Sequence, residues 1–238
     1  RLDVYLSENN TVKSRSLAAS LIKQGSVEVN GRICTKASFA VDENDNIRII
    51  GEMPKYVGRG GLKLEKALSH YRLHLDGSVC IDIGASTGGF TDCMLQNGAV
   101  KVYSVDVGTD QLDEKLRNDP RVVSMEKTDI RNCVGTLPTV DFIGIDVSFI
   151  SLKLILPSAY ALLKDGGECV ALIKPQFEAG KSHLSKHGIV RDSKVHKKVC
   201  DDISEFASTL GFERGEVISS PITGGDGNTE YLIYLRRL

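Results

Sequence analysis

The sequence predicts an α/β protein in two parts: a small α+β module at the N-terminus and a larger domain with a doubly wound, mostly parallel sheet. From residue 59 onward, apolar runs of strand length alternate with helical patterns, which is the order of elements that builds parallel sheets. The first 50 residues instead contain two short helical patterns followed by a hairpin signal. The turn-rich segment GEMPKYVGRGG separates the two parts. We therefore expect domains at 1–50 and 59–238, joined by a linker at 51–58.

Local signals define each element of the N-terminal module. RLDVYLSEN places its apolar side chains on one face of a short helix. RSLAASLIKQ predicts a second helix that ends at Gly25, because glycine is common just after a helix. SVEVNGRICT contains two alternating runs joined by Asn30-Gly31, the strongest short hairpin signal. DENDNIRII adds a turn and a third strand.

The larger domain shows seven strand patterns and five helical patterns in alternation. One helix, LKLILPSAYALLKDG, is expected to be interrupted by its internal proline, Pro157. The last two patterns, ERGEVISS and TEYLIYLRR, follow each other as strands without a helix between them. The predicted strands are 79–84, 101–108, 122–129, 140–148, 167–175, 213–220 and 229–237, and the predicted helices are 63–73, 88–98, 111–119, 152–166 and 194–211.

Composition excludes several classes of protein. Hydrophobic residues make up 41% and charged residues 26% of the 238 residues, which is ordinary for a globular protein. No apolar run is long enough to span a membrane, and the opening RLDVYLSENN lacks the apolar centre of a signal peptide. The six cysteines are widely spaced without a C-x-x-C pair, so a structural zinc site is not expected. The cytoplasm is the expected compartment, and no membrane partner is expected.

The stretch VCIDIGASTGGFTDCML joins the first strand of the larger domain to a helix, and its glycine-rich loop fits three templates. Gly84 to Gly88 matches the G-x-S-x-G turn of serine hydrolases, but no earlier strand of the domain supplies an oxyanion loop. A dinucleotide fingerprint has G-x-G-x-x-G, whereas this loop has G-x-S-x-G-G. The third template, the cofactor loop of an S-adenosylmethionine-dependent methyltransferase, is favoured by the acidic residues around the loop.

Acidic residues close four successive strands. Asp82 precedes the first glycine, where a carboxylate favours a ligand with a cationic end, such as the amino group and sulfonium of S-adenosylmethionine. Asp106 ends the next strand, at a place where a carboxylate typically binds ribose hydroxyls. Asp129 ends the third strand, in position to accept from an adenine amino group, and Asp146 ends the fourth. One such aspartate would be an ordinary turn cap, but four together favour a cofactor site.

The sequence therefore predicts S-adenosylmethionine as the cofactor, and no metal. The residues expected to bind the cofactor are Asp82, Gly84, Ala85, Ser86, Gly88, Gly89, Phe90, Asp106, Val107, Asp129, Ile130 and Asp146.

Four charged residues stand at unusual places in the larger domain. Lys63 lies in a helix that opens with RGGLKLEKAL, and Lys174 directly follows the apolar run CVALI. A lysine at the end of a buried strand requires carboxylate partners, and Asp146 and Glu230 are candidates. In order and surroundings, these four residues resemble the K-D-K-E tetrad of RrmJ/FtsJ-type ribose 2′-O-methyltransferases, which have a Rossmann-like fold.

This resemblance implies a catalytic role for each member of the tetrad. A ribose hydroxyl must lose its proton as it attacks the sulfonium methyl, so Lys174 is expected to act as a base or to steady the forming alkoxide. Asp146 is expected to orient Lys174, Lys63 to bias its charge, and Glu230 to hold the hydroxyl or the second amine. Taken singly, each residue could equally belong to a surface ion pair.

The order of elements in the N-terminal module, together with KSRSLAASLIKQGSVEVNG, resembles the S4 RNA-binding domain. The resemblance implies that basic residues of the module bind RNA, whereas charge alone would equally indicate a solvated surface. The residues expected to contact RNA are Arg1, Lys13, Arg15, Lys23, Arg32, Lys36 and, at the start of the larger domain, Arg59.

An S4-like module joined to an FtsJ-like domain, with VGRGGLKL, DIGASTGGFTDCML, VDVG, IDVSFISL, IKPQFE, GIVRD and GNTEYL, is similar over essentially the whole chain to the TlyA/hemolysin family of bacterial rRNA 2′-O-methyltransferases. The resemblance implies methylation of cytidine ribose, with ribosomal RNA or ribosomal subunits as the partner. The loop departs from FtsJ proteins at Ser86-Thr87, where Ala-Pro is usual.

Three other functions are open at this point. A membrane-active hemolysin would need a strongly apolar segment, and the helical patterns here carry frequent charges. An RNA-binding protein with an inactive methyltransferase domain would not need the four-residue constellation. A small-molecule methyltransferase would leave the N-terminal module without a role.

Overall fold

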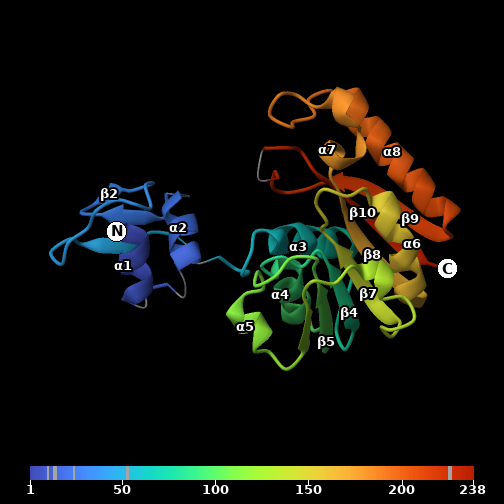
Figure 1. The fold of residues 1–238 in the computed structure, drawn as a ribbon, viewed down its shortest axis with the longest axis horizontal. Helices are drawn as coiled ribbons and strands as arrows, with labels where there is room; N and C mark the ends of the chain where they lie inside the picture. Colours follow the sequence, from blue (N-terminus) through green and yellow to red (C-terminus); the bar gives the residue numbers. More distant parts are fainter. Residues whose placement is uncertain (10, 13–14, 24, 52–53, 225–226) are drawn as a thin grey trace. The chain divides into compact units, whose positions relative to one another are not determined.

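The computed structural model describes residues 1–238 except residues 10, 13–14, 24, 52–53 and 225–226. The described residues form two compact units, Arg1–Met53 and Pro54–Leu238 (Figure 1). Tyr56, which the sequence places in the linker, is buried in a core of the second unit.

The first unit has the predicted order of two helices, a hairpin and a third strand. The helices pack on each other and on a three-stranded antiparallel sheet of order β2-β1-β3. Asn30 and Gly31 both have positive φ, 53° and 77°, as the tight turn between β1 and β2 requires. The elements are α1 (Leu2–Glu8), α2 (Arg15–Lys23), β1 (Val27–Val29), β2 (Arg32–Ile33) and β3 (Ile47–Ile49).

The second unit is built on a seven-stranded sheet of order β6-β5-β4-β7-β8-β10-β9. Strands β4 to β8 run parallel, and only β10 is antiparallel to its neighbours β8 and β9, so the predicted mostly parallel sheet is confirmed. The strands are β4 (Val79–Ile83), β5 (Lys101–Val105), β6 (Val122–Met125), β7 (Val140–Ile145), β8 (Leu163–Ile173), β9 (Phe212–Ser219) and β10 (Tyr231–Arg237).

Helices cover both faces of this sheet because successive strand residues are apolar on both sides. Cys80 of β4 packs with α3 and α4, whereas its neighbour Ile81 packs with α6 and α8. The same alternation continues through β7, β8 and β10, and it produces two separate hydrophobic cores. The helices are α3 (Gly60–Tyr71), α4 (Gly89–Gln96), α5 (Glu114–Arg117), α6 (Leu152–Leu162), α7 (Pro175–Glu178) and α8 (Ser193–Thr209), with short 3₁₀ helices at Ile130–Asn132 and Lys181–His183.

The structure differs from the prediction at several element ends. Helix α6 continues through Pro157, so the expected interruption is wrong. The ring of Pro157 is exposed, and Lys153, whose carbonyl loses a donor, also lies on the solvent side. Strand β6 ends at Met125, four residues before Asp129, because the chain turns at Lys127 with φ 51°. Helix α7, directly after Lys174, has no counterpart in the prediction.

Candidate active site

The loop between β4 and α4 is held in a conformation that requires its glycines. Gly84 and Gly88 have φ of 84° and 95°, in the left-handed region that glycine tolerates. A Cβ on Gly84 would lie 2.5 Å from the backbone oxygen of Asp146, and a Cβ on Gly88 would overlap the side chain of Leu116. The loop therefore lies directly against the end of β7 on one side and against α5 on the other.

Asp82 lies beneath this loop, fully buried in β4. Its Oδ2 accepts hydrogen bonds from the backbone N–H of Thr91 at 2.8 Å and from the Thr91 hydroxyl at 2.7 Å, which fixes the start of α4. Its Oδ1 is buried and has no hydrogen-bond partner among the described residues. Burial raises the pKa of Asp82 to about 7, although the two hydrogen bonds from Thr91 act in the opposite direction.

Asp106 follows the last residue of β5 and holds the loop from the side. Its Oδ2 accepts from the backbone N–H of Ser86 at 2.7 Å, and its Oδ1 accepts from the N–H of Gly108 at 2.7 Å. A small pocket opens between Asp106 and Glu126, which directly follows β6. Glu126 thus has the position that the sequence assigned to Asp129.

The carboxylate of Asp129 has partners outside the pockets. It forms an ion pair with Arg131 at 2.6 Å and caps the 3₁₀ helix that follows, and the hydrogen bonds from Arg131 lower its pKa. Ile130 is buried in a core, and the side chain of Val107 is exposed. Two pockets lie at this edge of the sheet. Of the twelve expected cofactor residues, six line the larger pocket and Asp106 lines the smaller one. Among the described lining residues of either pocket, the other five do not occur: Asp82, Gly88, Val107, Asp129 and Ile130.

A cavity of about 320 Å³ lies at the carboxyl edge of the sheet, and all four members of the expected tetrad line it. Lys63 is on α3, Asp146 follows β7, and Lys174 follows β8. Glu230 precedes β10, which runs antiparallel to β8 with Tyr231 opposite Ile173, so it reaches the same edge of the sheet as Lys174.

The tetrad forms a continuous chain of ion pairs. Lys174 Nζ lies 2.6 Å from Asp146 Oδ1, and Lys63 Nζ lies 3.4 Å from Asp146 Oδ2 and 2.8 Å from Glu230 Oε2. Lys174 also donates to the Ser148 hydroxyl at 2.8 Å. Lys63, Lys174 and Glu230 are only 8%, 8% and 3% exposed. Two ammonium groups and two carboxylates therefore compensate one another in a site largely shielded from water, where each needs its partners.

The mouth of the cavity contains aromatic residues that the sequence did not single out. Phe149 has φ 65°, a strained value for a bulky residue, and its side chain is 90% exposed. Its ring centroid lies 5.0 Å from that of Phe177, which α7 carries together with Gln176. These residues lie in the motifs SFISL, which begins two residues after Asp146, and KPQF, which begins at Lys174, and these motifs were the available signal.

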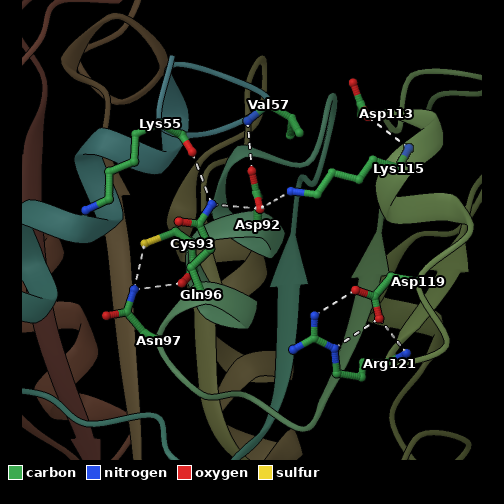
Figure 2. Close-up of polar contacts among 10 residues, drawn as sticks. All are labelled: Lys55, Val57, Asp92, Cys93, Gln96, Asn97, Asp113, Lys115, Asp119 and Arg121. Carbon is green, nitrogen blue, oxygen red and sulfur yellow. Dashed lines mark hydrogen bonds and ion pairs between the residues drawn. The ribbon is translucent and has the colours of Figure 1, made fainter. Parts of the chain in front are cut away.

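A buried carboxylate on α4 fixes the segment that leads into α3. Figure 2 shows Asp92 accepting from the N–H of Val57 at 2.9 Å and from Gln96 Nε2 at 3.0 Å, with Lys115 Nζ at 3.5 Å. The backbones also meet closely, since a Cβ on Gly89 would lie 2.8 Å from the nitrogen of Gly61. The position of Lys63 relative to the glycine-rich loop is therefore set by this contact.

In the N-terminal unit, two of the expected RNA-binding residues share one partner. Arg1 and Arg15 pair with the buried carboxylate of Asp3 through their Nε atoms, at 2.9 and 2.8 Å, and their hydrogen bonds hold the pKa of Asp3 well below its usual range. Lys23, Arg32 and Lys36 are exposed, whereas Lys13 lies outside the described residues. Arg59 belongs to the second unit, where it lines the cavity.

The sheet order and the loop after β4 define the class of the second unit: a Rossmann-like methyltransferase domain, preceded in the chain by a small α+β module. The chain matches the FtsJ-like methyltransferase family over residues 56–237 and the S4 domain over residues 1–47. It belongs to the FtsJ-like methyltransferase family. The fold class, the enzyme class and S-adenosylmethionine as cofactor, all predicted from the sequence, are confirmed.

Relatives extend over nearly the whole chain. Hemolysin A of Brachyspira hyodysenteriae is 42% identical over 239 residues, covering 98% of both proteins. The 16S/23S rRNA (cytidine-2′-O)-methyltransferase TlyA of Mycobacterium tuberculosis is 37% identical over 242 residues, covering 99% of this chain and 89% of the relative. A solved structure from Streptococcus thermophilus, described as a candidate hemolysin, is 47% identical with a TM-score of 0.79 and covers 100% of this chain and 88% of its own. Within the described residues, no helix combines the length and the apolar character needed to cross a lipid bilayer.

Proposed function

We propose that this methyltransferase transfers a methyl group from S-adenosylmethionine to the ribose 2′-hydroxyl of cytidine in ribosomal RNA, in the cytoplasm, on free rRNA or on ribosomal subunits. The observation that carries the proposal is the shielded Lys174–Asp146–Lys63–Glu230 chain at the cavity beside the glycine-rich loop. The S4 domain and the relative named as a cytidine-2′-O-methyltransferase support RNA as the substrate.

The residues around the loop fit the methyl donor. S-adenosylmethionine supplies a methyl group on a positively charged sulfur. The buried and unpartnered Oδ1 of Asp82 puts negative potential beneath the loop. Asp106 and Glu126 offer carboxylate oxygens at the smaller pocket, where ribose hydroxyls could donate to them. Gly84 and Gly88 allow the loop to pack directly against the end of β7 and against α5, which holds its backbone at the edge of the cavity.

The tetrad would act on the acceptor hydroxyl. Lys174 Nζ faces the cavity, held by Asp146 and Ser148. As the ammonium of the ion pair it would stabilise the oxygen that becomes negative during attack; to take the hydroxyl proton it would first have to release its own proton to solvent. Asp146 bridges the two lysines and so fixes the direction of Lys174. Because the donor is already activated, most of the rate acceleration would come from holding the hydroxyl in line with the methyl carbon.

The aromatic mouth of the cavity suits a nucleotide substrate. Proteins that act on single nucleotides commonly stack the unstacked base on an aromatic ring. Phe149, exposed and held in a strained backbone conformation beside Phe177, offers such a face next to Lys174. A small-molecule acceptor would not require it, nor the S4 domain.

The direct test is mass spectrometry of rRNA nucleosides after incubation with isotopically labelled S-adenosylmethionine. We expect label in 2′-O-methylcytidine with the intact protein and its loss with Lys174→Ala, while donor binding by calorimetry is retained. Lys153→Ala, an exposed lysine on α6, is the matched control and should leave the label unchanged. Label on a base, or label that survives Lys174→Ala, would contradict the proposal.

The hemolysin name of one relative suggests a different function, and the same preparations test it. Detergent-free protein that lyses erythrocytes in proportion to dose, equally with Lys174→Ala, would support a membrane activity. Donor binding without methyl transfer to any rRNA would instead support an inactive RNA-binding protein.

A further inference from the structure

The segment that follows α7, together with the first turns of α8, is strongly basic. Residues 180–198, which we call the basic arm, contain six lysine or arginine side chains and one aspartate, whereas the whole chain has a net charge of −1. All six cationic side chains are exposed, as are His183 and His187. The six are Lys181, Lys186, Arg191, Lys194, Lys197 and Lys198.

The positive charge of the basic arm is largely uncompensated. Within the described part of the chain, Lys197 is the one member with an ion pair, to Asp201 at 2.5 Å. Asp192, the single acid of the arm, caps α8 by accepting from the backbone N–H of Lys194. Clustered like charges repel one another, so an exposed group of unpaired cations is most favourable when a polyanion binds to it.

The base of the arm is anchored next to the tetrad. The buried side chain of Asn228 accepts from the N–H of Val190 at 3.2 Å and donates to the carbonyl of Gly188 at 3.1 Å. The buried His196 ring bonds to the Val190 carbonyl at 2.9 Å and to the Tyr231 hydroxyl at 2.9 Å. Asn228 is two residues before Glu230, and Figure 1 shows the arm (orange) on the same side of the sheet as the segment before β10 (red).

We propose that the basic arm binds the phosphate backbone of the RNA substrate beside the cavity. The proposal rests on the proposed function for the identity of the polyanion. Lysine and arginine contacts to phosphates position a nucleic acid without reading its sequence, which is what a target nucleotide entering the cavity requires of its flanking chain. The arm would supply this contact from the catalytic domain itself, in addition to the S4 domain.

A lipid surface is the other large anionic partner, and the arm does not suit it. Segments that bind membranes place apolar side chains beside their charges so that they enter the headgroup region. In the arm, Leu184 and Ile189 are half-buried and Val190 is buried, and the described residues of the arm include no exposed large apolar side chain.

The test measures RNA binding rather than methylation. The variant Lys181→Gln/Lys186→Gln/Arg191→Gln removes three arm charges, and its affinity for purified 16S and 23S rRNA is measured by filter binding over a range of salt concentrations. We expect binding about tenfold weaker at physiological salt, and a slope of log affinity against log salt that is smaller by about 2 to 3. Affinity for S-adenosylmethionine should stay at the wild-type value, which also checks folding.

The matched control removes three charges from the opposite edge of the sheet, as Lys101→Gln/Lys164→Gln/Arg236→Gln. Its net charge equals that of the arm variant, so we expect RNA affinity within about twofold of wild type. A charge-keeping variant, Lys181→Arg/Lys186→Arg/Arg191→Lys, should bind RNA as wild type does. Equal weakening by the control, or unchanged binding by the arm variant, would overturn the proposal.

The remaining outcomes separate the arm from the proposed function. If the wild type methylates no rRNA but the arm variant still loses RNA affinity selectively, the arm stands and the proposed function fails. If methylation is found and the arm variant binds RNA normally, only the arm fails. Arm-dependent binding to phosphatidylglycerol/phosphatidylcholine vesicles, with RNA affinity unchanged, would assign the arm to membranes and overturn the proposal.

Discussion

Each unit of the molecule has an aspartate paired with two cationic side chains, and the two clusters differ in how far those cations are exposed to solvent. In the N-terminal unit, Asp3 pairs with arginines whose side chains are 51% and 56% exposed. In the second unit, Asp146 pairs with lysines whose side chains are only 10% and 9% exposed. The exposed guanidinium groups are open to a partner in solution, whereas the buried ammonium groups can donate further only to a molecule that enters the cavity. The first arrangement suits binding to a surface, and the second suits chemistry on one group.

The largest effect should come from removing the shared acid of the tetrad. Asp146→Ala leaves two buried ammonium groups with one carboxylate, so we expect the free energy of unfolding to fall by about 3 kcal/mol or more and methyl transfer to vanish. Urea denaturation and label incorporation measure the two effects. Ser148→Ala removes one hydrogen bond to Lys174 and should cost about 1 kcal/mol. Equal stability losses from the two variants would show that the lysines do not depend on Asp146.

Asp82 extends the comparison, since no described cation pairs with it. Its contribution to the free energy of unfolding should therefore depend on pH. Its pKa is raised by burial to about 7 in the folded state, above an unfolded value of about 3.9, so the stability it contributes is present below about pH 4 and is lost as pH rises through 7. Asp82→Asn lacks this dependence. Relative to wild type, the variant should therefore gain stability between pH 5 and pH 8, on the order of 2 kcal/mol. Urea denaturation of the ligand-free proteins across this range measures the difference, and parallel pH profiles would contradict it.

Asp92 is a buried acid whose cation is exposed, so its two sides can be separated by mutation. Asp92→Ala leaves the N–H of Val57 without its acceptor and should lower the free energy of unfolding by about 1–3 kcal/mol. Lys115→Ala removes only the half-exposed cation at 3.5 Å and should cost less than about 1 kcal/mol. Thermal unfolding of both variants tests this ranking. A larger loss for Lys115→Ala would mean that the ion pair, and not the backbone contact, holds the segment before α3.

The smallest change is expected at an exposed member of the Asp3 group. Arg15→Gln should reduce the slope of log RNA affinity against log salt by about 1, as loss of a single phosphate contact does. Methyl transfer at saturating RNA should be retained, in contrast to Asp146→Ala. Filter binding across salt concentrations and initial rates at high RNA concentration provide the two readouts. An unchanged slope would assign Arg15 to packing with Asp3 alone.

The order of elements was predictable because the local signals agree with the tertiary structure. Asn30-Gly31 forms the expected turn, and the alternation of strands with helices gives the parallel part of the sheet. The antiparallel β10 was not predicted, although its consequence, Glu230 beside Lys63, was expected from the motif. Pro157 misled the prediction, because a proline is tolerated in a helix when the carbonyl it leaves unpaired faces solvent.

The site was only partly predictable because its members depend on where strands end. The apolar run of β6 continues into polar residues without a break in the pattern, and only the turn at Lys127 shows that Glu126, and not Asp129, faces the pocket. Phe149 reaches the cavity because its own backbone is strained, and Gln176 because it lies on the four-residue helix α7. Neither feature leaves a periodic pattern in the sequence. That the four tetrad residues lie together could be predicted, because charged residues directly beside buried strands are rare and therefore stand out in the sequence.

The absence of a side chain at Gly84 has a consequence for how mutations at this site can be interpreted. A single added carbon at position 84 would fall 2.5 Å from the carbonyl oxygen of Asp146, so alanine there would displace the peptide that carries the tetrad acid. Losses of donor affinity and of turnover would then occur together, and neither could be assigned to its own half of the site. In a saturation mutagenesis screen, position 84 should tolerate no replacement, including the smallest.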